Sequence, residues 1–179
     1  MTAVVGLDLS LSSTGVCVSD PEFGKQATTY RIKSQPVHTV HEMAARITDI
    51  TDRILQTVPN VATIVIEGPS YGSVNSGSAH ERAGLWWSVV TLVDLQGHPV
   101  TVVPPATLKK YATGSGNAGK DEVLAAAIRR YPDIKVTGND VADAAILCAI
   151  GLRLDGHALE DSLPQTHLAA LTKLLAVAA

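Results

Sequence analysis

The sequence Gly-Leu-Asp-Leu-Ser-Leu-Ser-Ser-Thr-Gly at residues 6–15 decides the fold of this chain of 179 residues. It places one acid, Asp8, inside an apolar strand, where an unpaired charge is unfavourable. Serines at 10–13 supply turn chemistry, and residues 15–19 read as a second strand. A third alternating run covers residues 28–34. Three consecutive strands joined by short turns predict an antiparallel meander.

Helical and strand patterns alternate after the meander. Apolar residues at steps of three and four over 39–58 predict an amphipathic helix, and a β-branched run at 62–66 predicts a buried parallel strand. The other expected elements are a helix at 80–95, a strand at 100–103, a short helix at 106–111, and helices at 120–131 and 140–154, the last with Asn139 as its N-cap. This order predicts an α/β fold: a mixed five-stranded sheet, with a three-strand antiparallel meander plus two parallel strands, flanked by helices.

The domain organisation follows from the same pattern. We expect one domain over residues 1–156 and a C-terminal helical extension at 157–179 that packs on it. A capping-box pattern at 162–165 predicts that Ser162 starts a helix in the extension. Three leucines mark one face of it: Leu168, Leu171 and Leu175.

Composition excludes several classes of protein. The charged fraction of 17% is low and the apolar fraction of 46% is ordinary, so the chain is not disordered. We expect no membrane span, because no apolar run reaches about 18 residues. The N-terminus has no basic leader, so we expect no signal peptide. Cys17 and Cys148 lie far apart in the sequence and each in apolar surroundings, as expected for reduced, buried thiols of a cytoplasmic protein.

Charge is unevenly distributed along the chain. The net charge of −3 argues against a protein that coats nucleic acid by bulk positive charge. Residues 109–135 are nevertheless basic, so the net charge does not exclude a local basic site. The bases of this segment are Lys109, Lys110, Lys120, Arg129, Arg130 and Lys135, and its acids are Asp121, Glu122 and Asp133.

Four acids need an explanation. Glu67 repeats the pattern of Asp8, because it closes an otherwise apolar strand. Asp140 and Asp143 are three residues apart, so on a helix they project from one face, which apolar residues continue. Each acid alone has an ordinary explanation: a solvated side of a strand, a strand end, or the first turn of a helix, where acids stabilise by ~0.3–1 kcal/mol.

If the four acids lie close together, their ordinary explanations no longer apply and they indicate a metal site. Two carboxylates about 4 Å apart repel by ~4 kcal/mol at an effective dielectric constant of 20. They therefore converge only when protonated or when cations lie between them. Mg²⁺ and Mn²⁺ prefer oxygen ligands, and two such ions flanked by carboxylates perform two-metal phosphodiester cleavage. Periodicity alone does not bring the four acids together.

Three motifs resemble those of RuvC-like Holliday junction resolvases, which belong to the RNase H-like superfamily. They lie at residues 6–15, at the strand end 65–67, and in Asn-Asp-Val-Ala-Asp-Ala at 139–144. The resemblance extends over about residues 3–154 and includes the order of the elements. It covers both bacterial and bacteriophage versions of the family, so we expect the protein to act in the bacterial cytoplasm or, if phage-encoded, in the host cell.

The resemblance implies roles for particular residues. Two Mg²⁺ or Mn²⁺ ions would be bound by the four acids Asp8, Glu67, Asp140 and Asp143. Lys109 and Lys120, eleven residues apart around a glycine-containing loop, would act near the scissile phosphate, and Lys110 would also contact DNA. Tyr71 would stack on an unpaired base, as an aromatic residue after the glutamate does in cellular members of the family.

The implied activity is that of an Mg²⁺- or Mn²⁺-dependent endodeoxyribonuclease that resolves Holliday junctions and other branched DNA. A metal-activated water would attack the phosphorus in line and leave 5′-phosphate and 3′-hydroxyl ends. A two-fold junction needs two incisions, so the resemblance implies a homodimer. The candidate dimer surfaces are the apolar run at 85–93 and the C-terminal leucine face.

Two alternatives to this activity remain. One is a nuclease of the same fold acting on RNA or single strands, and the other is a non-catalytic junction-binding protein. The retention of all four acids argues against the second. We expect no nucleotide cofactor, because the Walker A-like run at 114–120 is followed by Asp121 rather than by the Ser or Thr that binds Mg²⁺.

Overall fold

The computed structural model describes residues 2–19, 26–69 and 78–175. Tyr71, expected from the resemblance to stack on an unpaired base, lies outside the described residues.

Five strands form one sheet in the order β3-β2-β1-β4-β5. β1 pairs antiparallel with β2, and β2 with β3, while the β1–β4 and β4–β5 pairs are parallel. The predicted mixed sheet, a meander plus two parallel strands, is therefore confirmed. The strands are β1 (Ala3–Asp8), β2 (Ser13–Ser19), β3 (Ala27–Lys33), β4 (Ala62–Glu67) and β5 (Val100–Val103).

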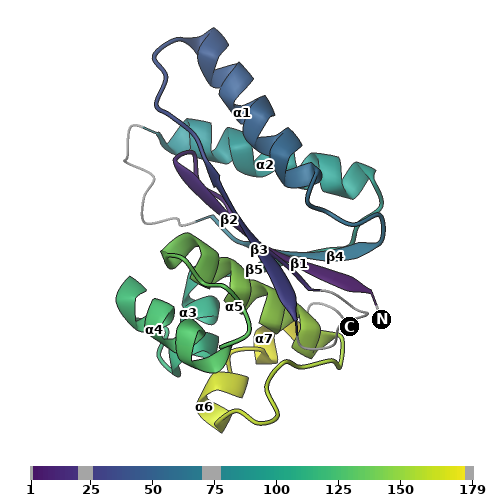
Figure 1. The fold of residues 1–179 in the computed structure, drawn as a ribbon, viewed down its shortest axis with the longest axis vertical. Coiled ribbons are helices and arrows are strands. Elements are labelled where there is room, and N and C mark those ends of the chain that lie inside the picture. Colours follow the sequence, from purple (N-terminus) through teal and green to yellow (C-terminus); the bar gives the residue numbers. More distant parts are fainter. Residues whose placement is uncertain (1, 20–25, 70–77, 176–179) are drawn as a thin grey trace.

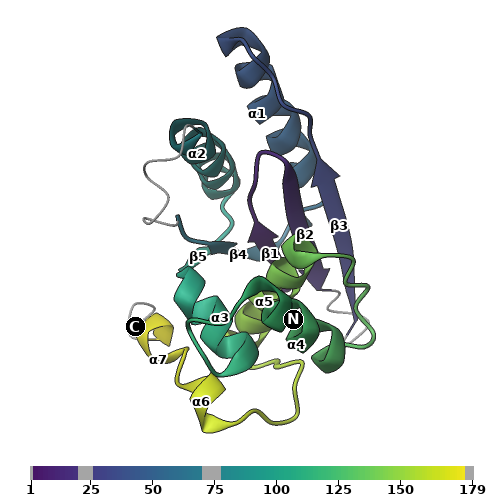
Figure 2. The same cartoon turned by 90° about the vertical axis from the view of Figure 1, so that its left-hand side faces the viewer.

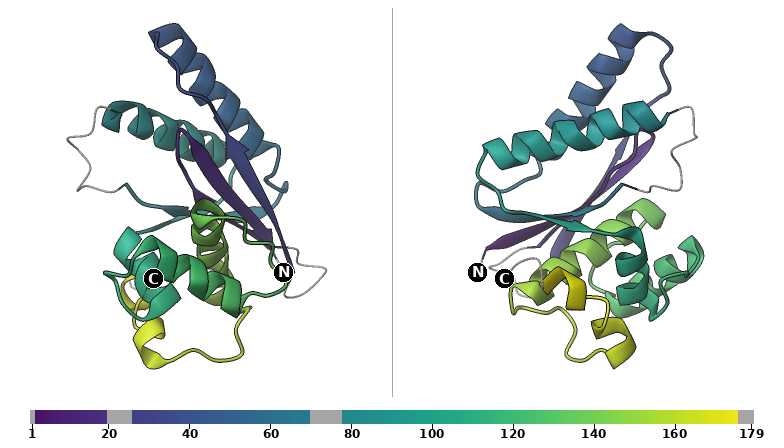
Figure 3. Two further views of the ribbon diagram at one scale, coloured as in Figure 1. Left: turned by 60° about the vertical axis from the view of Figure 1, so that its left-hand side comes forward. Right: turned by 180° about the vertical axis from the view of Figure 1, so that it is seen from behind.

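Helices cover both faces of the sheet, as the edge-on view in Figure 2 shows. One face carries α1 (Val40–Leu55) and α2 (Ala79–Leu95) (Figure 1). The other face carries α3 (Pro105–Thr113), α4 (Lys120–Arg130) and α5 (Asn139–Leu154), followed by the short helices α6 (Gln165–Leu168) and α7 (Thr172–Leu175) (Figure 3). No helix in the described part of the chain is long and apolar enough to cross a membrane.

The alternation of side chains along each strand determines which acids face α5. On β1, Val5 belongs to the core beneath α1 and α2, whereas Val4 belongs to the core beneath α5. Asp8 is an even-numbered residue like Val4 and so points toward α5. On β4, Val65 lies in the α5 core, so Glu67, two residues later, points the same way.

Helix α5 lies directly against the sheet because glycines leave room for its backbone. A Cβ at Gly6 would lie 2.1 Å from the carbonyl oxygen of Ala144, and a Cβ at Gly15 would lie 2.0 Å from that of Asp140. Both distances are far shorter than any normal contact, so larger residues would push α5 off the sheet.

Gly6→Ala is expected to lower the free energy of unfolding by about 3 kcal/mol or more, because the added methyl group meets backbone on a buried helix. Gly84→Ala on α2 is the matched control, since its Cβ would meet nothing closer than Cδ1 of Ile47 at 3.5 Å. In an exposed helix interior this change should stabilise by about 0.5–1 kcal/mol. Urea unfolding measures both, and equal effects would contradict the predicted packing.

The segment after α5 is joined to the same side of the sheet through Glu160, whose side chain is 4% exposed. Its carboxylate accepts hydrogen bonds from the hydroxyl of Tyr111 at 3.0 Å and from that of Tyr131. Nη2 of Arg153 donates to it at 2.9 Å. Apolar residues of the segment join the core beneath α5: Leu159, Ala170 and Leu171.

Two predicted helix starts are wrong. Helix α5 has Gly138 as its N-cap, with Asn139 already inside the helix, because the first helical hydrogen bond runs from Ala142 N to Gly138 O at 2.9 Å. Ser162 does not cap the tail helix. The backbone N–H groups of His167 and Leu168 instead donate to the carbonyl of Pro164, whose fixed φ favours a helix start. The tail forms two short helices, α6 and α7, rather than one.

Candidate active site

One row of residues crosses four strands on the α5 face. Arg31 of β3 lies opposite Gly15 of β2, which lies opposite Asp8 of β1. The parallel β1–β4 pair places Leu7 beside Ile66, and the next residues along are Asp8 and Glu67. Neighbours in one row point to the same face of a sheet. The fold therefore sets Asp8 and Glu67 side by side at the strand ends.

Helix α5 places two more acids over this row. The backbone of Asp140 contacts β2 at Gly15, and Asp143 follows on the same side of the helix. The negative charges of Glu67, Asp143 and Asp140 all raise the pKa of Asp8. The structure thus brings together the four acids on three elements.

Positive charge only partly balances the acids of the cluster. Burial raises the pKa of Asp8 well above its usual range, and the neighbouring carboxylates add to this. Burial and then the charge of Glu67 raise the pKa of Asp143 to about 7. The pKa of Glu67 is also raised by burial, although a hydrogen bond with Asp8 and two lysines partly offset this. Burial and the neighbouring negative charges therefore favour the protonated form of Asp8 in the metal-free protein.

The two lysines predicted near the scissile phosphate lie at this cluster. Lys109 of α3 and Lys120, the first residue of α4, both lower the pKa of Glu67 and of Asp143. Lys110 also lies on α3 but is not among the main charges acting on these carboxylates. Tyr71 lies outside the described residues.

Comparison with known proteins gives the family. No family model matches the chain. The crossover junction endodeoxyribonuclease RuvC of Rickettsia bellii (strain OSU 85-389) is 30% identical over 148 residues, which cover 80% of this chain and 92% of that protein. The RuvC of Synechococcus sp. (strain CC9311) is 30% identical over 158 residues, covering 83% and 96%. This chain belongs to the RuvC family.

Two solved structures show the same fold. Thermus thermophilus RuvC superposes with a TM-score of 0.65 at 21% identity, covering 87% of this chain and 98% of its own. T. thermophilus RuvC in complex with Holliday junction substrate gives the same TM-score at 20% identity, covering 88% and 98%. The RNase H-like fold of the RuvC type that the sequence predicts is therefore confirmed.

The acids suit the divalent metal that membership of the RuvC family implies. Their oxygens are the donors that Mg²⁺ and Mn²⁺ prefer. The raised pKa values of Asp8, Glu67 and Asp143 indicate a deficit of positive charge that a cation would supply. Among the described residues, no three His, Cys, Asp or Glu side chains already stand at metal-ligand spacing. Metal binding is thus expected to release the protons that the cluster holds.

Three side chains at the site were not found by sequence reasoning. The indole Nε1 of Trp86 donates to the backbone carbonyl of Glu67 at 3.0 Å and anchors that strand end. Arg31 and Ser13 contact the carboxylate of Asp140. The strand alternation shows that Arg31 and Ser13 face one side, but only the strand register places them beside α5.

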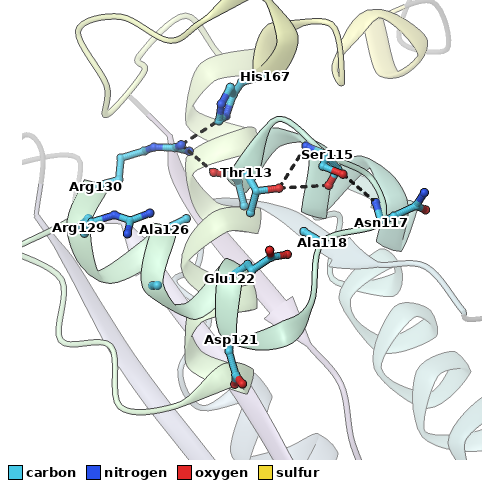
Figure 4. A pocket seen from close by; sticks show the side chains of 12 residues that line it. Thr113, Ser115, Asn117, Ala118, Asp121, Glu122, Ala126, Arg129, Arg130 and His167 are labelled. Atoms are coloured by element: carbon cyan, nitrogen blue, oxygen red, sulfur yellow. Dashed lines mark hydrogen bonds between the residues drawn. The ribbon is translucent and has the colours of Figure 1, made fainter.

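A separate hollow of about 1020 Å³ lies between the α3–α4 loop, α4 and His167 of α6 (Figure 4). None of the four acids, Lys109 or Lys120 lines it. Arg130 lies at its edge, where its guanidinium donates to the carbonyls of Tyr111 at 3.2 Å and Ala112 at 2.7 Å. Arg130 therefore stabilises the C-terminal end of α3. Arg129, which also lines the hollow, is exposed.

The raised pKa of Asp143 predicts that the metal-free protein loses stability as pH rises. Between its ordinary pKa of 3.8 and about 7, the folded protein holds a proton that the unfolded chain releases. The free energy of unfolding with a chelator present should therefore fall by roughly 2–3 kcal/mol from pH 5 to pH 7.5. Urea unfolding of the wild type and of Asp143→Asn measures this. The fall should be smaller in the variant, and an equal fall in both would contradict it.

Proposed function

We propose that this chain is a structure-selective endonuclease that resolves Holliday junctions and other branched DNA by hydrolysing phosphodiester bonds. The observation that carries the proposal is the convergence of four acids and two lysines at one edge of the sheet, in a chain of the RuvC family. Relatives that cover most of the chain bear the name crossover junction endodeoxyribonuclease, and one solved structure with this fold is bound to a Holliday junction substrate.

The acids of the site are assigned to metal binding and the two lysines to phosphate binding. Asp8, Glu67, Asp140 and Asp143 would hold two Mg²⁺ or Mn²⁺ ions. Such ions, when bound, stabilise the charge on the attacking and leaving oxygens of a phosphodiester. Lys120 begins α4, where backbone N–H groups also favour an anion, so it is placed to bind the phosphate together with Lys109. The products would carry 5′-phosphate and 3′-hydroxyl ends.

A panel of labelled substrates tests this function. A four-way junction, a linear duplex, a flap and an RNA–DNA hybrid are incubated with the protein and Mg²⁺ or Mn²⁺. We expect cutting of the junction and flap, little cutting of the duplex, and none with a chelator present. Cutting of the hybrid alone would indicate an RNA-directed nuclease, and binding of junctions without cutting would indicate a non-catalytic protein.

We also propose that the protein acts as a homodimer through the outer face of α2. Each chain carries one acid cluster, whereas a four-way junction has two opposed strands to cut. Trp87, Thr91 and Leu95 follow at steps of four and are all exposed, although two of them are large and apolar. Trp87 packs edge-on against Trp86, with ring centroids 4.9 Å apart. Trp86 also donates to the backbone carbonyl of Glu67, so the Trp86 ring connects the proposed surface to the acid cluster.

Trp87→Glu is expected to weaken the dimer about 30-fold or more, because a large aromatic at the centre of an interface typically contributes about 2 kcal/mol or more. Trp87 is 62% exposed, and Ile128 on α4, which is 50% exposed, provides the matched control. Ile128→Glu adds the same charge elsewhere and should leave the dimer intact. Sedimentation at micromolar concentration measures both, and a monomeric wild type would contradict the dimer.

We further propose that the protein acts in the cytoplasm. Cys17 and Cys148 are both free and fully buried, as suits a reducing compartment. The proposed substrate, branched DNA, lies in the same compartment in bacteria.

A further inference from the structure

Asp140 has a partner that the proposed mechanism does not use. Nε of Arg31 donates to Oδ2 of Asp140 at 2.7 Å, and the hydroxyl of Ser13 donates to the same oxygen. Arg31 also donates to the Ser13 hydroxyl at 3.0 Å, which closes a three-membered cluster. The Asp140 side chain is 9% exposed and that of Arg31 is 38% exposed. A buried acid on α5 is thus paired with a partly exposed base from the edge strand β3.

The strand register places Arg31 there. It stands in the row that runs from β3 through Gly15 to Asp8 and points to the α5 face with them. Gly15 has no side chain to block the path, so the guanidinium extends over β2 to the start of α5. Gly138 also leaves space, since a Cβ on it would lie 3.1 Å from Oδ1 of Asp140 and 3.4 Å from Nη1 of Arg31.

Among the residues that the structure describes, the hydrogen bonds of the Asp140 carboxylate all reach Oδ2 and none reaches Oδ1. Oδ2 accepts two hydrogen bonds, so a cation bound by Asp140 would use Oδ1. That cation would lie beside the guanidinium, because both would contact one small carboxylate, and like charges repel. Arginine stays protonated at any accessible pH, so deprotonation cannot relieve this repulsion.

We propose that Arg31 is a built-in counter-ion of Asp140 that competes with the divalent ion for this carboxylate. In the metal-free protein it keeps a buried acid paired, since removal of one partner from a buried ion pair is strongly destabilising. The same charge lowers the affinity of the Asp140 side of the site for metal. This inference rests on the proposed function, because it takes Asp140 as a metal ligand.

Calorimetric titration with Mn²⁺ in the absence of DNA tests the inference. Arg31→Gln is expected to bind Mn²⁺ about 3- to 10-fold more tightly than the wild type, because a repelling charge is gone. Arg31→Lys keeps the charge and should bind as the wild type does. Ser13→Ala removes a hydrogen bond without removing charge and should not bind more tightly. Arg53→Gln, which breaks an exposed ion pair with Asp49 on α1, is the matched control and should change nothing.

Thermal unfolding gives a second readout. Metal-free Arg31→Gln should unfold at a lower temperature than the wild type, and Mn²⁺ should raise its unfolding temperature by more. Equal or weaker Mn²⁺ binding by Arg31→Gln, or equally tight binding by Arg31→Lys, would overturn the inference. If the wild type itself binds no Mn²⁺, or if Asp8→Asn binds it as well, the proposed metal site fails instead.

Discussion

Asp8→Asn is expected to lower the rate of junction cleavage by roughly 10³-fold or more, which corresponds to about 4 kcal/mol of lost transition-state stabilisation. Asp8 is the acid on which the charges of the other three act, so it lies at the centre of the cluster. Asparagine has nearly the same shape but offers one neutral oxygen in place of a carboxylate. Junction affinity, measured with Ca²⁺ in place of Mg²⁺, should stay close to that of the wild type.

Stability separates this loss from misfolding. Burial and three neighbouring carboxylates disfavour the charged form of Asp8, so its replacement removes repulsion. Metal-free Asp8→Asn should therefore unfold at the same temperature as the wild type or a higher one, as expected where a site is kept at a cost in stability. Asp52→Asn, at an exposed acid on α1, is the control and should cut normally. An Asp8→Asn protein that is stable and still cuts at the wild-type rate would refute the role of Asp8.

The sequence predicts the fold because each periodicity is local. The apolar run of β1, the spacing of three and four in α1 and the β-branched run of β4 each depend on neighbouring residues. The position of Asp8 in an apolar strand and that of Glu67 at a strand end could be read in the same way. Asp140 and Asp143 required only the geometry of one helix.

The contacts between elements could not be predicted from the sequence. Arg31 reaches Asp140 only because β3 pairs with β2 in the register that sets it opposite Gly15, and a shift of one residue would turn it to the other face. Trp86 donates to the backbone carbonyl of Glu67. Every residue type has such a carbonyl, so the sequence does not indicate this contact. The two predicted N-caps were wrong for a related reason. Asn139 and Ser162 have side chains suited to capping, but the backbone begins the helices at Gly138 and Pro164.

Lys120→Ala is expected to slow junction cleavage by about 10²- to 10³-fold, the usual cost of removing one donor that stabilises transition-state charge. Lys109→Ala should have an effect of similar size, since both lysines act on Glu67 and Asp143. Lys110→Ala, next to Lys109 on the same helix, is the control. It should weaken junction binding about twofold, as loss of one phosphate contact does, and leave the rate at saturation unchanged.

The pH–rate profile distinguishes this role from simple DNA binding. Lys120 lowers the pKa of Asp8, Glu67 and Asp143, so its removal raises all three. The carboxylates must then lose protons at higher pH before they can bind metal, and the acidic limb of the profile should move to higher pH. Single-turnover cleavage between pH 6 and pH 9 measures the shift. A lysine that only contacted DNA would weaken binding and leave the limb in place, and that result would contradict the position of Lys120 within the cluster.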